Sequence, residues 1–231
     1  MQKRVNNAMG QRPVENFVGS SVSLRYGGMQ TASRSRVEMF GDDAPVWHFL
    51  DQFGGPADPL TGNCVTGVIE TYPVLAMIAL GWTRPVPNRR YTGRLPKYNP
   101  GRKKTFSIED WQHVCASASK ELSDFKLNGL ANWIGNIRQK EEPKKKDQDC
   151  VDACINMIVA LRLTGSRKCL MVGDVRTGYI VVPHSPELHE ELAARCEETG
   201  RVPAAWTRAF RRRAWTIVQH GNIAGGACSV A

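Results

Sequence analysis

The segment from Lys144 to Leu163 constrains the fold more than any other stretch of this sequence. Its apolar residues recur at three- and four-residue intervals, which predicts an α-helix with one buried face. Asp147 is a good N-cap residue, because its carboxylate can accept hydrogen bonds from the free backbone N–H groups of the first turn. The residues that we expect on the buried face are Val151, Cys154, Ile155, Ile158 and Val159.

Two acidic residues of this helix, Asp149 and Asp152, are three positions apart and so lie on nearly the same side, with Asn156 one turn further on. Two negative charges this close repel each other unless solvent or a cation screens them. The pair therefore has two interpretations: two solvated acids, or two ligands of a divalent metal ion. These residues alone favour solvated acids, and carboxylates elsewhere in the chain must decide.

Glu70 is the carboxylate that could complete such a site. Residues 65–71 read as a buried strand, and Pro73 then begins an apolar helix that Gly81 ends. Glu70 thus lies at the carboxyl end of a strand, where open α/β sheets place their sites. Together, Glu70, Asp149 and Asp152 suit Mg²⁺ or Mn²⁺, which prefer oxygen ligands. Two such ions can activate water and stabilise the leaving oxygen in phosphodiester cleavage.

The remaining pattern predicts a mixture of helices and strands. Residues 169–172 and 179–182 are expected to form two strands joined by a hairpin-like turn. Ser107 caps a helix that extends to Asp124. Residues 20–26 alternate enough for a short strand or an extended loop. Further helices are expected at residues 3–9, 44–53, 127–138 and 186–198.

The formal net charge of +9 favours an anionic partner, and nucleic acid is the first candidate. Much of the positive charge sits in four short clusters, each of which solubility alone could explain. One of them, residues 211–213, belongs to the C-terminal region. The other three are expected to hold a phosphate backbone, through Arg89, Arg90, Arg102, Lys103, Lys104, Lys144, Lys145 and Lys146.

Residues 1–203 are expected to form one domain, and residues 204–231 a basic and aromatic C-terminal extension. In the extension Trp206, Phe210 and Trp215 alternate with arginines. These side chains could stack on bases, as in single-strand binders, or pack as an amphipathic helix. The helical spacing favours packing.

Several common classes of protein are not supported by the sequence. It contains no long apolar stretch and no signal-peptide region, which predicts a soluble, cytoplasmic protein with no membrane partner. Its cysteines form no paired knuckles, so neither a zinc ribbon nor a disulfide framework is expected. His184 and His189 are five positions apart, a spacing that suits no common zinc motif.

The segments 69–73, 97–100, 149–153 and 177–183 together resemble the predicted ribonuclease-H-like nuclease family (domain of unknown function 429). They read Ile-Glu-Thr-Tyr-Pro, Lys-Tyr-Asn-Pro, Asp-Cys-Val-Asp-Ala and Thr-Gly-Tyr-Ile-Val-Val-Pro. The resemblance runs from about Arg12 to Pro203. Its elements are weak separately and moderately specific in this order.

The resemblance implies an α/β fold, a ribonuclease-H-like mixed sheet flanked by helices, with acidic residues that bind two metal ions. Glu70 would match the strand-end carboxylate of the family, and Asp152 with Asp149 the acids of its late helix. The family is expected to begin with a strand that carries an essential Asp. No such strand precedes Val65, so we expect a domain that is incomplete at the N-terminus.

The sequence therefore leads to two hypotheses for function. The first is a metal-dependent nuclease that hydrolyses phosphodiester bonds with Glu70, Asp149 and Asp152. The alternative is a non-catalytic basic domain that binds nucleic acid or a protein partner. Metal dependence distinguishes them, because only the nuclease needs the divalent ion.

Overall fold

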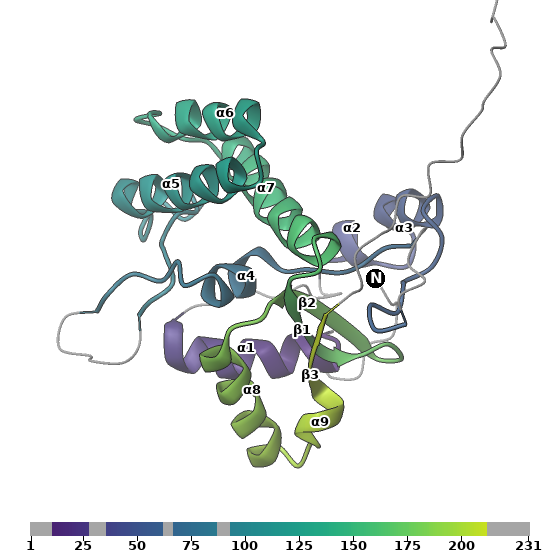
Figure 1. Ribbon diagram of the computed structural model, residues 1–231. Coiled ribbons are helices and arrows are strands. Elements are labelled where there is room, and N and C mark those ends of the chain that lie inside the picture. The colour runs from purple at the N-terminus through teal and green to yellow at the C-terminus, as the bar shows by residue number, and fades with distance from the viewer. Residues whose placement is uncertain (1–10, 28–35, 62–66, 87–92, 212–231) are drawn as a thin grey trace, which may run out of the picture.

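The computed structural model describes residues 11–27, 36–61, 67–86 and 93–211. This part of the chain forms a mixed α/β fold in which helices surround a small antiparallel sheet (Figure 1). The α/β class expected from the sequence is confirmed at this level. The helix predicted at residues 3–9 and the basic pair Arg89 and Arg90 lie outside the described residues.

The sheet has three strands, β1 (Lys168–Asp174), β2 (Gly178–Pro183) and β3 (Thr207–Arg211), in the order β2-β1-β3. The β1–β2 pair is the predicted hairpin, and its register sets Cys169 opposite Pro183. The other edge of β1 pairs antiparallel with β3. The central strand is buried along most of its length, which explains its nearly continuous apolar sequence.

Helix α7 (Lys145–Thr164) links the two ends of the molecule. It packs against α5 (Ile108–Asp124), which lies side by side with α6 (Asn128–Arg138), and Arg162 near its end pairs with Glu121 of α5 (Figure 1). Helix α4 (Pro73–Ala79) contacts α7 from the other side. All five residues predicted for the buried face of α7 are buried, namely Val151, Cys154, Ile155, Ile158 and Val159.

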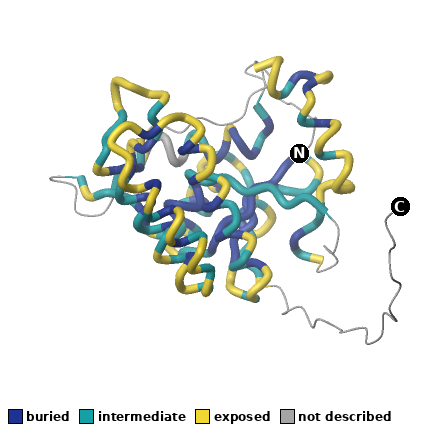
Figure 2. Tube along the Cα trace, turned by 90° about the horizontal axis from the view of Figure 1, so that it is seen from above, coloured by how far each residue is buried: buried dark blue, intermediate teal, exposed yellow. Residues whose placement is uncertain are grey.

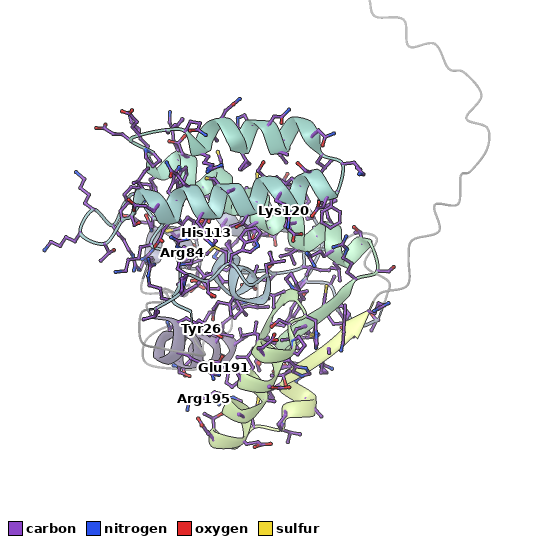
Figure 3. All side chains as sticks on the ribbon, turned by 60° about the vertical axis from the view of Figure 1, so that its left-hand side comes forward. Tyr26, Arg84, His113, Lys120, Glu191 and Arg195 are labelled. Carbon is purple, nitrogen blue, oxygen red and sulfur yellow. The ribbon has the colours of Figure 1, made fainter. Side chains whose placement is uncertain are left out.

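Three helices complete the fold beside the sheet: α1 (Pro13–Tyr26), α8 (Pro186–Glu198) and α9 (Pro203–Trp206). Tyr26, Glu191 and Arg195 lie where α1 meets α8 (Figure 3). Two short helices, α2 (Val37–Phe40) and α3 (Pro45–Asp51), stand apart and contact each other. Figure 2 shows the buried residues gathered in the interior and the exposed ones around it. No helix of the described residues is both long enough and apolar enough to cross a membrane.

Several helices begin and end as the sequence predicts. The Ser107 hydroxyl accepts a hydrogen bond from the backbone N–H of Asp110 at 3.2 Å, as expected of an N-cap. Pro73 is the first residue of α4, and Gly81 follows its end with φ +74°, a conformation that glycine adopts without strain. Asp147 is not the N-cap of α7. It lies at the third helical position, where its carboxylate accepts from the backbone N–H of Lys144 at 2.8 Å.

Three predicted elements differ from the structure. Residues 20–26 are part of helix α1, because the upstream residues Val14, Phe17 and Val18 bury one helical face. In the segment predicted as the strand 65–71, the described residues 67–71 form no regular strand: Val68 makes an isolated bridge to Pro56. Residues 207–211 form strand β3 rather than a helix, because the free edge of β1 supplies backbone partners that the local spacing does not reveal.

Candidate nucleic-acid interface

Glu70 lies in the extended segment before α4, where its backbone carbonyl accepts from the N–H of Val181 at 2.8 Å. Both of its carboxylate oxygens accept hydrogen bonds from the Arg12 guanidinium, at 2.7 and 2.5 Å. Arg12 also donates to the buried carboxylate of Glu15. The two strongest donors near Glu70 are therefore the N–H groups of a buried arginine, in a cluster of three charges.

The charge of Arg12 follows from its contacts. Burial alone would lower the pKa of Arg12, but its hydrogen bonds to Glu70 and Glu15 outweigh that effect and raise the pKa further above its usual value. The guanidinium lies against Gly178, where a Cβ atom would come within 3.2 Å of Nη1. Arg12 therefore stays charged, and its close packing leaves it one arrangement.

Asp149 and Asp152 face different surroundings, although they are only three residues apart on α7. Asp149 points outward, with 60% of its side chain exposed, and forms an ion pair with Lys145 one turn before it. Asp152 is half-buried and accepts from the Tyr98 hydroxyl at 2.6 Å and from the Gln148 amide at 3.0 Å. The edge of the buried face runs between the two acids, so they do not act as one pair.

Asp152 belongs to a buried polar cluster with two tyrosines. Burial raises the pKa of Asp152 above its usual value, and the hydrogen bond from Tyr98 and the charge of Lys145 only partly offset this rise. The pKa values of Tyr98 and Tyr72 are also raised, first by burial and then by the negative charge of Asp152. The cluster therefore keeps both phenols neutral beside one carboxylate.

Three side-chain oxygens near this part of the chain are buried without a hydrogen-bond partner among the described residues. They belong to Thr71, Gln148 and Asn156. Gln148 and Asn156 flank Asp152 at one-turn intervals on α7, so the helix presents a polar stripe among its apolar residues.

Two of the basic clusters lie close to each other and near this polar stripe. The turn at residues 99–105 carries Arg102, Lys103 and Lys104, and a Cβ atom on Gly101 would lie 3.9 Å from Cδ of Lys145. The positive charge of Arg102 partly offsets the rise in the pKa of Tyr72, and the positive charge of Lys145 partly offsets the rise in the pKa of Asp152. Both cations therefore lie close to the polar cluster. We call the exposed set the basic surface: Arg102, Lys103, Lys104, Lys144, Lys145 and Lys146.

The three acids do not assemble into a metal site in this arrangement. Across the described ranges, no group of three or more His, Cys, Asp or Glu side chains is placed to hold a metal ion. Glu70 is bound by Arg12, Asp149 by Lys145, and Asp152 by two neutral donors. Each of the three acids thus has a separate partner among the described residues.

The sequence singles out Asp152 and the basic residues as candidates, but it does not single out the two tyrosines that lie near Asp152. Tyr72 and Tyr98 precede prolines in two of the segments that carry the family resemblance, and that was the only signal in the sequence. Their meeting with Asp152 depends on the path that the described segments 67–86 and 93–100 take past α7. No periodicity in the chain predicts that path.

Comparisons of the chain with protein-family models, with curated proteins and with solved structures found no match. The function must therefore be argued from the geometry of the site.

Proposed function

We propose that this protein binds the phosphate backbone of nucleic acid through the basic surface. One observation carries the proposal: Gly101 and Lys145 are neighbours in space, so two clusters far apart in sequence form a single cationic area. Neighbouring cations along a phosphate backbone release condensed counterions, which is the main source of such affinity.

The charges of the basic surface are available for a ligand. All six side chains belong to exposed residues. The pair between Lys145 and Asp149 is solvent-exposed on both sides, so it holds Lys145 only weakly. The start of α7 also contributes positive partial charge from its free backbone N–H groups.

The test is binding of a fluorescent RNA or DNA oligonucleotide at several salt concentrations. The double variant Lys103→Gln/Lys146→Gln removes one charge from each cluster. We expect it to weaken binding on the order of tenfold and to reduce the salt slope by about 0.9 for each lost duplex contact, or about 0.7 on a single strand.

A matched control removes the same charge elsewhere. Lys120→Gln/Arg176→Gln changes two exposed cations, one on α5 (Figure 3) and one in the β1–β2 turn. It is expected to leave the affinity within about twofold of wild type, since distant surface charges are largely screened. Equal loss in the two variants would show that net charge, and not this surface, binds the ligand.

The second candidate function is the metal-dependent nuclease of the ribonuclease-H-like kind that the family resemblance suggests. One observation favours it: Asp152 is a half-buried carboxylate close to Lys145, which belongs to the basic surface. Cleavage of a labelled oligonucleotide with Mg²⁺ or Mn²⁺, lost on chelation and in Asp152→Asn while binding persists, would support it. Binding without any metal-dependent cleavage leaves the binding function alone.

A further inference from the structure

His184 and His189 are brought together by the turn that joins β2 to α8. His184 follows the last residue of β2, and His189 lies in the first turns of α8. The Nε2 atom of His184 is 3.3 Å from the Nδ1 atom of His189. The two rings are nearly perpendicular, at 76°, and their centroids are 5.3 Å apart.

The other nitrogen of His189 fixes which atom faces His184. Its Nε2 atom is 2.8 Å from the carbonyl oxygen of Thr207. A carbonyl oxygen only accepts, so Nε2 carries the proton and Nδ1 of the neutral ring presents a lone pair toward His184. A backbone carbonyl that orients the second ring nitrogen is the usual support of a metal-binding histidine.

The spacing of the two rings matches a shared tetrahedral metal ion. With Zn–N bonds of about 2.0–2.1 Å, two ligand nitrogens are about 3.3–3.4 Å apart and the ring centroids about 5.2 Å apart. Without the ion, the same 3.3 Å separation corresponds to a direct N–H···N hydrogen bond between the rings.

We infer that His184 and His189 form a two-histidine site for Zn²⁺, with water in the remaining coordination positions. Two charged groups face His184 besides its partner: Lys168 on β1 and Glu187 on α8. Glu187 is exposed and accepts from the Ser185 hydroxyl at 2.9 Å, so its carboxylate offsets the repulsion between Lys168 and the ion. With two protein ligands the site binds more weakly than a structural site with four.

The site would link three elements of the fold. His184 extends β2, His189 belongs to α8, and Thr207 begins β3. Zinc that binds the folded state and not the unfolded chain raises stability with its concentration. This role is separate from the basic surface, whose residues lie on α7 and the 99–105 turn.

The test is calorimetric titration of the full chain with zinc chloride at pH 7.5, in a Cys150→Ser background that removes an exposed thiol. We expect one saturable site in this protein, and a loss of affinity of about tenfold or more in His184→Gln and in His189→Gln. His48→Gln is the matched control, because His48 is an exposed histidine on α3, and it is expected to bind as the parent does.

A second measurement does not depend on the variants folding. Zinc added to the parent protein should shift the imidazole NMR signals of His184 and His189 together. The inference is overturned if those two signals stay in place, or if folded His184→Gln and His189→Gln bind zinc as tightly as the parent.

Discussion

At Arg12 a buried guanidinium is held between Glu15 and Glu70, whereas the cations of the basic surface lie exposed around the start of α7. The first set of charges is closed, because nearly every donor has a carboxylate partner inside the protein. The second is open, because the acid that pairs with Lys145 in the described part of the chain, Asp149, is itself exposed. A buried charge pair is costly to break, because the remaining charge loses its partner, whereas an exposed charge is available to a ligand.

The largest effect should come from opening the closed cluster. Arg12→Met leaves the carboxylates of Glu15 and Glu70 without their cation, and we expect a loss of about 3–5 kcal/mol in the free energy of unfolding. Urea denaturation measures it. Lys145→Met is the control: Lys145 and its partner Asp149 are both more than half exposed, so the loss should stay below about 1 kcal/mol.

The triple variant Arg12→Met/Glu15→Gln/Glu70→Gln sharpens this prediction. If the unpaired charges cause the loss, removing all three should restore more than half of the stability. A triple variant as unstable as Arg12→Met would mean that packing, and not charge, governs the cluster.

Asp110 is a second charged residue that is paired inside the protein. Its replacement is expected to have a smaller, pH-dependent effect on the free energy of unfolding. Burial tends to raise its pKa, but hydrogen bonds from Arg94 and from the Lys97 N–H, at 2.6 Å, outweigh it and lower the pKa. Its contribution is therefore present above the ordinary pKa of about 3.9 and is lost as pH falls below it. We expect Asp110→Asn to cost about 1.5–3 kcal/mol at pH 7.

The pH dependence is the check on Asp110. The difference in unfolding free energy between wild type and Asp110→Asn should narrow as pH falls below about 4. A difference that stays constant from pH 7 to pH 3 would contradict the assignment.

Asp152, beside the open surface, should respond in the opposite direction. Its pKa is raised, mainly by burial, so the charged form is disfavoured in the folded protein and wild type loses stability as pH rises above about 4. Asp152→Asn should therefore be more stable at pH 7, by up to about 1 kcal/mol, and equal to wild type below about pH 4. Thermal melts at the two pH values test both the sign and the window.

The smallest effect on stability is expected from the basic surface itself. Lys103→Gln/Lys146→Gln should change the free energy of unfolding by no more than about 0.5 kcal/mol, because neither side chain is buried. The same variant is expected to lose affinity for an oligonucleotide. A large loss of stability would mean that the surface is part of the structure and not of a ligand site.

The parts of the fold that the sequence predicts are those set by local patterns. Helices α4, α5, α7 and α8 and the β1–β2 hairpin each have a helical or alternating period and a cap, proline or glycine at a boundary. Helix α6 was also expected; within it Ile137 is buried whereas Trp133, another large apolar residue, is exposed. The spacing of apolar residues therefore predicts that the helix exists, but it predicts less well which of its residues are buried.

The parts of the fold that the sequence does not predict depend on contacts between residues that are far apart in the chain. Strand β3 forms because β1 has a free edge, and the segment around Glu70 stays irregular because it meets β2 through one backbone hydrogen bond to Val181. The candidate site shows the same limit. Charge identified the basic residues and Asp152, but only the fold pairs Glu70 with Arg12 and brings Tyr98 to Asp152.

The strand order β2-β1-β3 has a consequence for synthesis on the ribosome. Strands β1 and β2 are neighbours in the chain and can pair as soon as both have emerged, but the second edge of β1 waits for residues 207–211. During that interval a buried, apolar strand presents unpaired backbone groups, the condition in which nascent chains associate with one another. Chains stopped before Thr207 should therefore depend on chaperones to remain in solution, whereas chains that reach Arg211 should not.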